Sequence, residues 1–229
     1  MKKFFLFSSI ALLMSALGAG VIFAGYSARN EGGRTGLSPV RDGFGNTVSI
    51  LNRFDGRKSY IQIAKYDPNG NTLCNTYHPS DFSEEANSLS VDSMGNIYVA
   101  GFRESRDGRH ALAFKYSSTC EPRWEFTDEY HQCMALDIVY DANGNSWVGG
   151  SCAIGNTNPA KLIKLNPNGR RLWDSLYDGG GKNYVVGLSP DYGNNVSMTV
   201  QVVPAGYSGG YSFEKTVAFN NQGARVAAF

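Results

Sequence analysis

Two short segments concentrate basic side chains that could bind an anionic group. They span residues 53–58 and 103–110, and each contains an Asp-Gly-Arg tripeptide. Arg and Lys side chains form charge-assisted hydrogen bonds with carboxylate and phosphate oxygens, so the segments predict a polar face that binds an anionic glycan or a protein partner. The residues of this predicted face are Arg53, Arg57, Lys58, Arg103, Arg106, Arg109 and His110.

A second interpretation of the same segments is a solvated loop face whose opposite charges lie near one another. Acidic residues occur in the connections between the repeats described below. Exposed ion pairs of this kind are common and contribute little free energy, so we favour this interpretation over a binding face. The acidic residues concerned are Asp81, Glu84, Glu85, Asp128 and Glu129.

The residue patterns predict no catalytic centre, metal site or cofactor. His78, His110 and His131 are isolated in sequence, and none has the spacing of a metal-binding pair. Residues 67–71 and 141–145 resemble the start of a calcium-binding loop, but neither segment ends in the acidic ligand that such a loop needs. Turn formation explains both, so enzymatic activity is not favoured. A Ser-His-Asp triad stays open, because its members meet in space rather than in sequence.

The composition favours an all-β protein. The 229 residues include 21 Lys and Arg against 20 Asp and Glu, and the formal net charge of +1 argues against a nucleic-acid-binding protein, which needs a basic surface. Gly accounts for 27 residues, aromatic residues for 13% and charged residues for only 18%. A helical bundle or coiled coil would be rich in Ala, Glu, Lys and Leu, whereas many turns and aromatic residues are typical of β-sheets.

The first 24 residues have the pattern of a secretory signal peptide. Lys2 and Lys3 precede an apolar stretch that starts at Phe4, and small residues up to Ala24 offer cleavage positions. We therefore predict a signal peptide at 1–24, followed by a linker at 25–33, and an exported protein that is periplasmic, cell-surface or secreted. An uncleaved membrane anchor is the alternative. No later apolar run is long enough to span a membrane.

A repeat organises the rest of the chain. Gly-Asn recurs at residues 45, 95, 144 and 193, and an Asp stands three residues before the Gly in the first three copies. A second signature, Lys-x-x-Pro-Asn-Gly, begins at Lys65 and Lys164, and copy two has Lys115 followed by a degraded turn. In such turns Asp hydrogen-bonds to the backbone two residues on, and Gly adopts a positive φ. The two signatures recur with the same period and at a constant offset from each other, which indicates four tandem copies of one structural unit. The position nine residues after the Lys is occupied in turn by Cys74, Trp124 and Trp173.

Each copy is predicted to form four short strands. In copy two, the segments 87–91, 96–102, 111–116 and 123–126 are rich in β-forming residues or alternate apolar and polar residues. Tandem four-stranded units are typical of a β-propeller, so we predict an all-β propeller with four four-stranded antiparallel blades. We expect the blades to close into a ring; an open array, or a half-ring that pairs with a second chain, is the alternative. The predicted propeller covers residues 34–229, with blades at about 34–78, 86–129, 133–178 and 183–229.

The four cysteines of an exported protein are expected to pair as disulfides. Cys133 and Cys152 are placed symmetrically about a turn centred on residues 142–143, so they should face each other across neighbouring strands. A second disulfide is predicted between Cys74 and Cys120, which lie in adjacent predicted blades. None of the four has CxxC spacing, so zinc binding is not predicted.

The repeats resemble the bacterial β-propeller repeat family called SBBP. The resemblance rests on segments 91–101 and 113–116 in copy two and on 147–150 and 161–169, followed by Trp173, in copy three. It covers about residues 35–229 and implies an exported or surface β-propeller without a common activity. Two shorter stretches are similar to motifs of enzyme propellers: residues 169–173 to the tryptophan motif of pyrroloquinoline-quinone propellers, and residues 90–95 to the Asp-box of sialidases.

The function predicted from these patterns is that of a binding or scaffold module for a protein or glycan partner. Loops held by a rigid scaffold are suited to recognition. The alternative is a carbohydrate-active or quinone-dependent propeller enzyme. Two carboxylates flanking a central pocket would favour a glycosidase over a binding protein. The sequence predicts no oligomeric state.

Overall fold

The computed structural model describes residues 36–191, 193–206 and 211–226. The predicted signal peptide (1–24) and linker (25–33) lie outside the described residues. The described strands form four antiparallel sheets of four strands each, and within every sheet the strands pair in chain order. The predicted all-β architecture of four four-stranded blades is therefore confirmed.

The strands of each blade follow one another along the chain. Blade one consists of β1 (Val40–Arg41), β2 (Thr47–Phe54), β3 (Ser59–Tyr66) and β4 (Thr72–Tyr77). Blade two consists of β5 (Ser83–Val91), β6 (Ile97–Ser105), β7 (Gly108–Tyr116) and β8 (Pro122–His131). Blade three consists of β9 (Cys133–Tyr140), β10 (Ser146–Cys152), β11 (Ala160–Leu165) and β12 (Arg171–Tyr177). Blade four consists of β13 (Lys182–Pro190), β14 (Val196–Val203), β15 (Phe213–Phe219) and β16 (Arg225–Val226).

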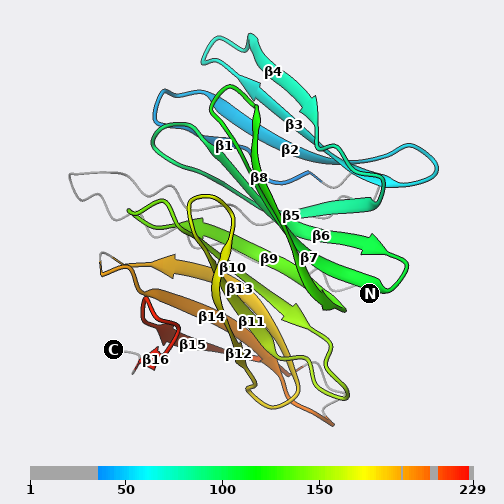
Figure 1. Cartoon of the computed structure of the whole chain (residues 1–229), viewed down its shortest axis with the longest axis vertical. Helices are drawn as coiled ribbons and strands as arrows, with labels where there is room; N and C mark the ends of the chain where they lie inside the picture. The colour runs from blue at the N-terminus through cyan, green and yellow to red at the C-terminus, as the bar shows by residue number, and fades with distance from the viewer. Residues whose placement is uncertain (1–35, 192, 207–210, 227–229) are drawn as a thin grey trace, which may run out of the picture.

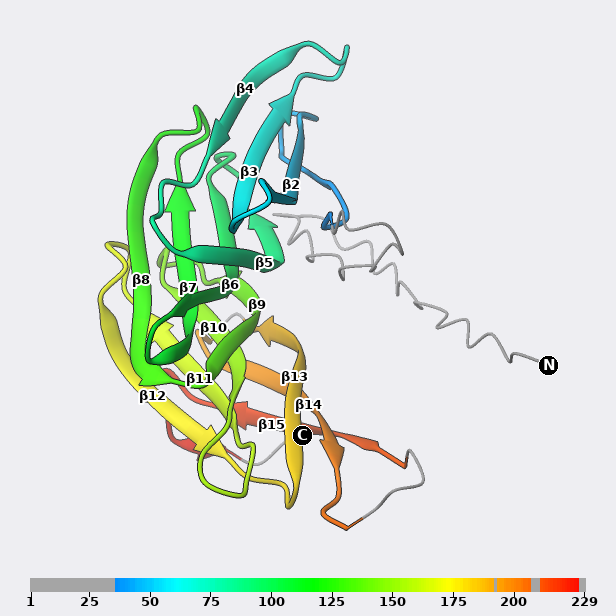
Figure 2. The same ribbon diagram turned by 90° about the vertical axis from the view of Figure 1, so that its right-hand side faces the viewer.

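The blades follow one another along an open arc, with blades one and four at its two ends (Figures 1 and 2). The inner strands β5, β9 and β13 pack on one another, and β8 and β12 lie on the convex side of the arc (Figure 2). Each seam between consecutive blades buries an apolar cluster: one around Ile63 and Leu89, one around Ala113 and Ile138, and one around Leu162 and Val200. Burial of both faces of the two middle sheets explains their apolar second strands.

The recurring Asp-x-x-Gly-Asn segments form the turn between the first two strands of blades one, two and three. In blade one, Asp42 Oδ1 accepts hydrogen bonds from the backbone N–H groups of Phe44 and Asn46, each at 2.9 Å, and Gly45 has φ +80°. The same pattern recurs at Asp92 and Asp141. These hydrogen bonds hold the turn and explain why Asp and Gly recur at a fixed spacing.

In the fourth blade the turn is displaced by one residue relative to the Gly-Asn repeat. Asp191 Oδ1 accepts from the backbone N–H groups of Gly193 and Asn195, as Asp42 does from Phe44 and Asn46. Asn194, with φ +57°, therefore takes the position that Gly occupies in the other blades. Asn tolerates this left-handed conformation better than most residues, which is why the turn survives the change.

At each of the three seams, a side chain from the last strand of one blade contacts the turn before the last strand of the next blade. The contact is a disulfide at the first seam and a Trp–Gly contact at the other two. Cys74 of blade one forms a disulfide with Cys120 of blade two, with Cα atoms 6.3 Å apart. At the next seam Trp124 packs against Gly169, close enough that a Cβ at that glycine would lie 2.7 Å from the indole. The third seam repeats this arrangement, since a Cβ at Gly223 would lie 2.8 Å from Trp173.

The turn of copy two, which lacks the Pro-Asn-Gly sequence, has a cysteine at the position of this glycine. Cys120 stands five residues after Lys115, as Gly169 does after Lys164, and it retains the left-handed backbone with φ +61°. The disulfide therefore replaces the Trp–Gly contact at the first seam. A positive φ in a non-glycine residue costs free energy, and the covalent bond holds the residue in place.

The expected ring closure is not found. No strand of blade one packs against a strand of blade four to the extent seen between consecutive blades, among the residues that the structure describes. A Cβ at Gly70, which would receive a Trp from a preceding blade, has no neighbour within 4 Å. In the sequence, Ala227 stands at the position that Cys74, Trp124 and Trp173 occupy in the earlier copies. The residues of β14 that face away from blade three include Ser197, Thr199 and Gln201, a polar surface typical of a terminal repeat.

Candidate functional site

The disulfide between Cys133 and Cys152 lies next to the candidate site, whose lining includes the neighbouring residues Gln132 and Ala153. The two residues pair directly across β9 and β10, with Cα atoms 4.0 Å apart, as their placement about the turn predicted. Just beyond them, the backbone N–H of Ala153 donates to the carbonyl oxygen of Gln132 at 2.8 Å. The hairpin is therefore closed by a covalent bond and a hydrogen bond at the end that meets the β10–β11 loop.

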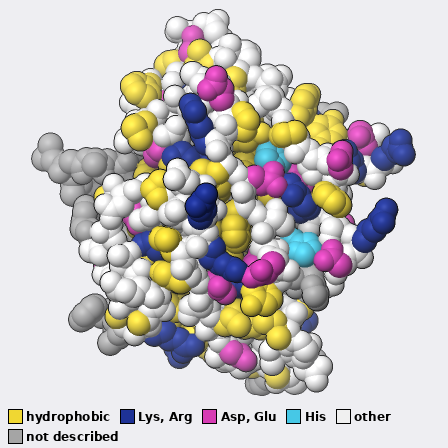
Figure 3. Space-filling model, in the orientation of Figure 1, with side chains coloured by type: hydrophobic (Ala, Val, Ile, Leu, Met, Phe, Trp, Pro, Cys, Tyr) yellow, Lys and Arg dark blue, Asp and Glu magenta, His cyan; other side chains and the backbone are white. Residues whose placement is uncertain are grey.

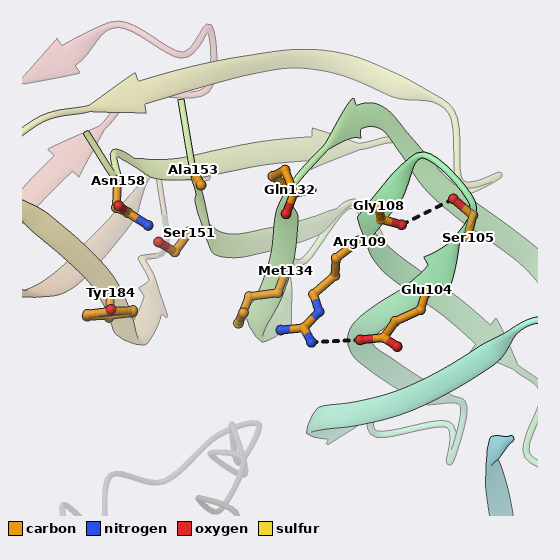
Figure 4. A pocket seen from close by; sticks show the side chains of 10 residues that line it. All are labelled: Glu104, Ser105, Gly108, Arg109, Gln132, Met134, Ser151, Ala153, Asn158 and Tyr184. Atoms are coloured by element: carbon orange, nitrogen blue, oxygen red, sulfur yellow. Dashed lines mark hydrogen bonds and ion pairs between the residues drawn. The ribbon is translucent and has the colours of Figure 1, made fainter. Parts of the chain in front are cut away.

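A cavity of about 510 Å³ opens beside this disulfide, and we call it the rim pocket (Figure 4). Its lining comes from three blades, because the β6–β7 hairpin of blade two faces the start of β9, the β10–β11 loop and β13. Small-molecule sites commonly have volumes of this size. The lining residues are Glu104, Ser105, Gly108, Arg109, Gln132, Met134, Ser151, Ala153, Asn158 and Tyr184.

The charges of the rim pocket neutralise each other. Arg109 donates to Glu104 Oε1 at 2.7 Å, and its guanidinium also lies over the ring of Phe102, 4.1 Å from the centroid. Figure 4 shows this ion pair on one side of the pocket, with Asn158, Ser151 and Tyr184 on the other. Glu104 is the one carboxylate among the lining residues, and Arg109 the one guanidinium. The remaining polar groups are neutral amides and hydroxyls.

The seven basic residues predicted from the sequence do not form one patch. Arg109 lines the rim pocket, while Arg57 and Arg106 lie exposed in loops. Arg53 donates to Gln62 Oε1 at 2.7 Å on the outer face of blade one. The other three residues bind neighbouring groups of the protein. Lys58 donates to the carbonyl oxygen of Ser80, and His110 is buried with Nδ1 2.9 Å from the carbonyl oxygen of Asp128. Arg103 belongs to a buried ion-pair network.

The network around Arg103 lies at the seam between blades one and two. Arg103 donates to Glu84 Oε1 at 2.6 Å and to Glu125 Oε1 at 2.7 Å, and the Glu84 carboxylate is completely buried. His78 Nε2 lies 3.1 Å from Glu125 Oε2 and 3.8 Å from Glu84 Oε2. Burial opposes the charge of Arg103, but Glu84 and Glu125 together raise its pKa above the ordinary value. The hydrogen bond with His78, aided by Arg103, lowers the pKa of Glu125.

A second network joins blades two and three. Lys161 donates to Asp128 Oδ2 at 2.6 Å, with both side chains buried, and lies over the ring of Tyr130. Arg171 pairs with Glu129, and this hydrogen bond is the main cause of the lowered pKa of Glu129. Acidic, basic and His side chains intermix on the face shown in Figure 3. Opposite charges thus pair across the seams instead of forming a surface of one sign.

Most of the rim pocket could not be found from sequence. Gln132, Met134, Asn158 and Tyr184 belong to no motif, and they meet only because blades three and four are rotated against blade two. A weak signal was available for Gln132, which immediately precedes Cys133 of the predicted hairpin disulfide. The sequence places Glu84 and Asp128 among the acidic residues near the basic segments, but their burial depends on how the blades pack at the seams.

Further properties of the described residues bear on environment. The two disulfides indicate an oxidising environment outside the cytoplasm. No group of three or more His, Cys, Asp or Glu side chains suited to holding a metal ion occurs in the described part of the chain. Residues 36–191, 193–206 and 211–226 contain no helix of the length and hydropathy that crossing a membrane requires.

Comparison with known proteins supports the fold alone. The chain is similar to the crystal structure, at 1.35 Å resolution, of a protein of unknown function from Bacteroides caccae, with a TM-score of 0.53 and 12% sequence identity. The similarity covers 87% of this chain and 68% of that one. No family model matches the sequence, so the likeness of its repeats to the SBBP family stays a resemblance. No curated protein matches it either.

Proposed function

We propose that this chain is an exported repeat protein of the SBBP type that binds a neutral glycan in the rim pocket. The protein acts outside the cytoplasm, in the periplasm, at the cell surface or after secretion, and the first 24 residues direct its export. The pocket, with its neutral polar lining around Tyr184, is the observation that carries this proposal.

The lining suits sugar hydroxyl groups. The amides of Gln132 and Asn158 each offer donors and an acceptor, and the hydroxyls of Ser105 and Ser151 can do either. Tyr184 supplies an aromatic surface, which is apolar on its face and polar at its hydroxyl. A hexose presents hydroxyl groups around an apolar ring face, so both kinds of surface have a counterpart in the ligand.

The charge balance of the pocket favours a neutral glycan over the anionic one that the basic loops suggested. Arg109 is the one lining cation, and Glu104 already neutralises it. An anionic sugar would have to displace Glu104 from this pair. Because the pair is partly exposed, it contributes little to stability but holds Arg109 along the wall, where its N–H groups can still donate to hydroxyls.

The rigidity of the rim also supports a binding role. The disulfide between Cys133 and Cys152 closes the hairpin beside the pocket, so the wall is held in place before a ligand arrives. Preorganisation of this kind reduces the entropy lost on binding. The glycosidase alternative would need two carboxylates flanking the bond to be cleaved, and Glu104 is the one carboxylate of the described lining.

A glycan array probed with the exported, oxidised protein tests the proposal. We expect binding to neutral oligosaccharides, and we expect Tyr184→Ala to weaken it about tenfold, since one aromatic contact is lost. Tyr77→Ala removes an exposed tyrosine from blade one, far from the pocket in sequence and in the arc, and should leave affinity unchanged. Circular dichroism and thermal melting confirm that each variant is folded.

Two results would overturn this assignment. One is the absence of any retained neutral glycan on the array. The other is equal affinity of the Tyr184→Ala variant and the parent protein. Binding to a protein partner that Arg57→Ala and Arg109→Ala weaken, with no glycan bound, would support the alternative role as a protein-binding scaffold.

A further inference from the structure

Lys65 and Lys164 are repeat-equivalent residues whose ammonium groups each contact two oxygen atoms. Lys65 Nζ lies 2.9 Å from Asp42 Oδ2 and donates to the carbonyl oxygen of Ser118 at 3.0 Å. Lys164 Nζ lies 3.3 Å from Asp141 Oδ2 and donates to the side chain of Asn221. In both blades the lysine therefore has a carboxylate from its own blade and an oxygen acceptor from the next one.

Lys115 occupies the same position in blade two, but it makes neither of these two direct contacts among the described residues. The carboxylate of Asp92 accepts a hydrogen bond from the hydroxyl of Tyr98 at 3.0 Å and does not pair with Lys115. Pro167 stands where blades two and four have Ser118 and Asn221, but among the described residues Lys115 forms no hydrogen bond with it. What Lys115 retains, among the described residues, is the ring of Tyr98, 4.7 Å from its Nζ. Burial lowers the pKa of Lys115 and the charge of Arg123 adds to this effect, while the nearby charge of Asp92 opposes it.

The unsatisfied lysine lines a cavity of about 240 Å³ between blades two and three, which we call the seam cavity. Its residues come from the β5–β6 turn, the end of β7, the start of β8 and the β11–β12 turn. In an antiparallel blade these turns lie at the edge opposite to the second-to-third-strand loops, so the seam cavity and the rim pocket open at opposite edges. The lining residues are Asn96, Lys115, Arg123, Trp124, Pro167 and Asn168.

The seam cavity collects donors without a carboxylate in its lining. Lys115 and Arg123 are both cationic, and the ion pair of Arg123 with Glu121 is long, at 3.4 Å, and exposed. The indole N–H of Trp124 is buried without an acceptor, whereas Trp173 at the next seam donates to the carbonyl oxygen of Asn221 at 2.9 Å. A buried donor without an acceptor costs free energy that a bound acceptor can recover.

We propose that the seam cavity is a binding site for a small oxyanion, namely a carboxylate or sulfate group, which Lys115 and Arg123 hold. The anion supplies the charge that Asp42 and Asp141 supply to the equivalent lysines. The amide of Asn168 offers a further donor at the mouth of the cavity. This site is independent of the glycan proposed for the rim pocket, since no lining residue is shared.

Nuclear magnetic resonance titration of the exported protein with sodium sulfate and, separately, sodium acetate tests this assignment. We expect saturable shifts of the Trp124 indole N–H and of the Lys115 side chain, with millimolar affinity. Lys115→Met, which keeps the length of the side chain, should weaken binding at least tenfold, because one charge-assisted hydrogen bond is lost. Arg41→Gln removes an exposed cation from blade one and should leave the affinity unchanged.

The two anions also distinguish the two ligand classes, a sulfate-type group and a carboxylate. Saturation by sulfate alone identifies a sulfate-type group, and saturation by acetate alone identifies a carboxylate. The proposal is overturned if neither anion gives a saturable shift, or if Lys115→Met binds the anion as well as the parent protein does. Chemical denaturation of the Lys115→Met variant provides the check that it folds. Arg123→Gln offers a second substitution, at an exposed residue, with the same expected direction.

Discussion

Lys65 Nζ lies 2.9 Å from Asp42 Oδ2 in the interior of blade one, and this pair joins the two sequence signatures of the repeat. Asp42 belongs to the turn between β1 and β2, and Lys65 to the end of β3. The turn of blade two approaches both groups, since a Cβ at Gly95 would lie 3.1 Å from Lys65 Nζ and 3.2 Å from Asp42 Oδ2. In blades one and three the fixed spacing of the two signatures therefore places an Asp and a Lys where they form an ion pair.

Asp42→Asn should destabilise the protein by about 3 kcal/mol, because it leaves the buried ammonium of Lys65 without its counter-charge. The measurement is urea denaturation at neutral pH. Asp67→Asn is the matched control, since Asp67 makes the same turn hydrogen bonds at the exposed turn between β3 and β4. The control should lose clearly less stability. Equal losses would mean that the turn, and not the ion pair, accounts for the effect.

Arg103→Met should lower the free energy of unfolding by about 3–5 kcal/mol, since the completely buried carboxylate of Glu84 loses its partner. Arg109→Met is the control, because Arg109 pairs with an exposed glutamate and the expected loss is below about 1 kcal/mol. Both values come from chemical denaturation. A loss of similar size in the two variants would contradict the distinction between the buried and the exposed ion pair.

The first seam should accept the contact used at the other two. Replacing both Cys74 and Cys120 by Ala opens a loop of sequence separation 46, and the expected loss is about 4 kcal/mol. The double variant Cys74→Trp with Cys120→Gly should recover part of this loss, since it recreates the Trp–Gly contact and places Gly at φ +61°. Thermal and urea unfolding measure the difference. The seams are not equivalent if the Trp–Gly variant is no more stable than the double alanine variant.

Gly169→Ala should be more destabilising than Gly70→Ala, although both residues have similar backbone angles, φ +77° and +87°. At Gly70 the added Cβ meets nothing within 4 Å, so only the left-handed backbone costs free energy, about 1 kcal/mol. At Gly169 the Cβ would lie 2.7 Å from the Trp124 indole, which should add about 1–3 kcal/mol. Denaturant midpoints of the two variants provide the comparison, and the order of the two losses decides it.

Asp42 and Asp137 should titrate on opposite sides of the ordinary aspartate pKa of 3.8. Burial opposes ionisation of Asp42, but hydrogen bonds from Asn46, Lys65 and the turn outweigh it and lower its pKa. Its contribution to stability is present above pH 3.8 and is lost as the pH falls through the lowered pKa. Burial raises the pKa of Asp137, so its ionisation reduces stability as the pH rises from 3.8 to the folded-state value.

Carboxyl-carbon resonances followed through an acid titration measure the two pKa values directly. Asp137 accepts hydrogen bonds from Ser88 of β5 and from the backbone N–H of Leu188 of β13, each at 2.8 Å. It therefore reports on the packing of three inner strands. A folded-state pKa of Asp137 below that of Asp42 would contradict the burial described for this carboxylate.

The sequence by itself determined the local structure of the repeat. The turn at residues 42–46 is specified by Asp42, Gly45 and Asn46 through a hydrogen bond between residues four positions apart. Interactions over so short a distance in sequence can be predicted without knowledge of the tertiary structure. The pairing of Cys133 with Cys152 was readable for the same reason, since both lie on one hairpin. The one-residue displacement at Asp191 escaped the sequence pattern, because the Gly-Asn pair at residues 193–194 kept its period while the turn moved.

Only the tertiary structure decided how the blades meet. The open arc depends on the unfilled space at Gly70, and the rim pocket depends on the angle that brings Tyr184 toward Arg109. At the seam cavity Lys115 lies over the ring of Tyr98, whose hydroxyl donates to Asp92, and the direct ion pair of Lys65 and Lys164 is not repeated. Contacts between blades depend on the rotation of each sheet against the next, and that rotation is set by packing across the seam, which no spacing within one repeat encodes.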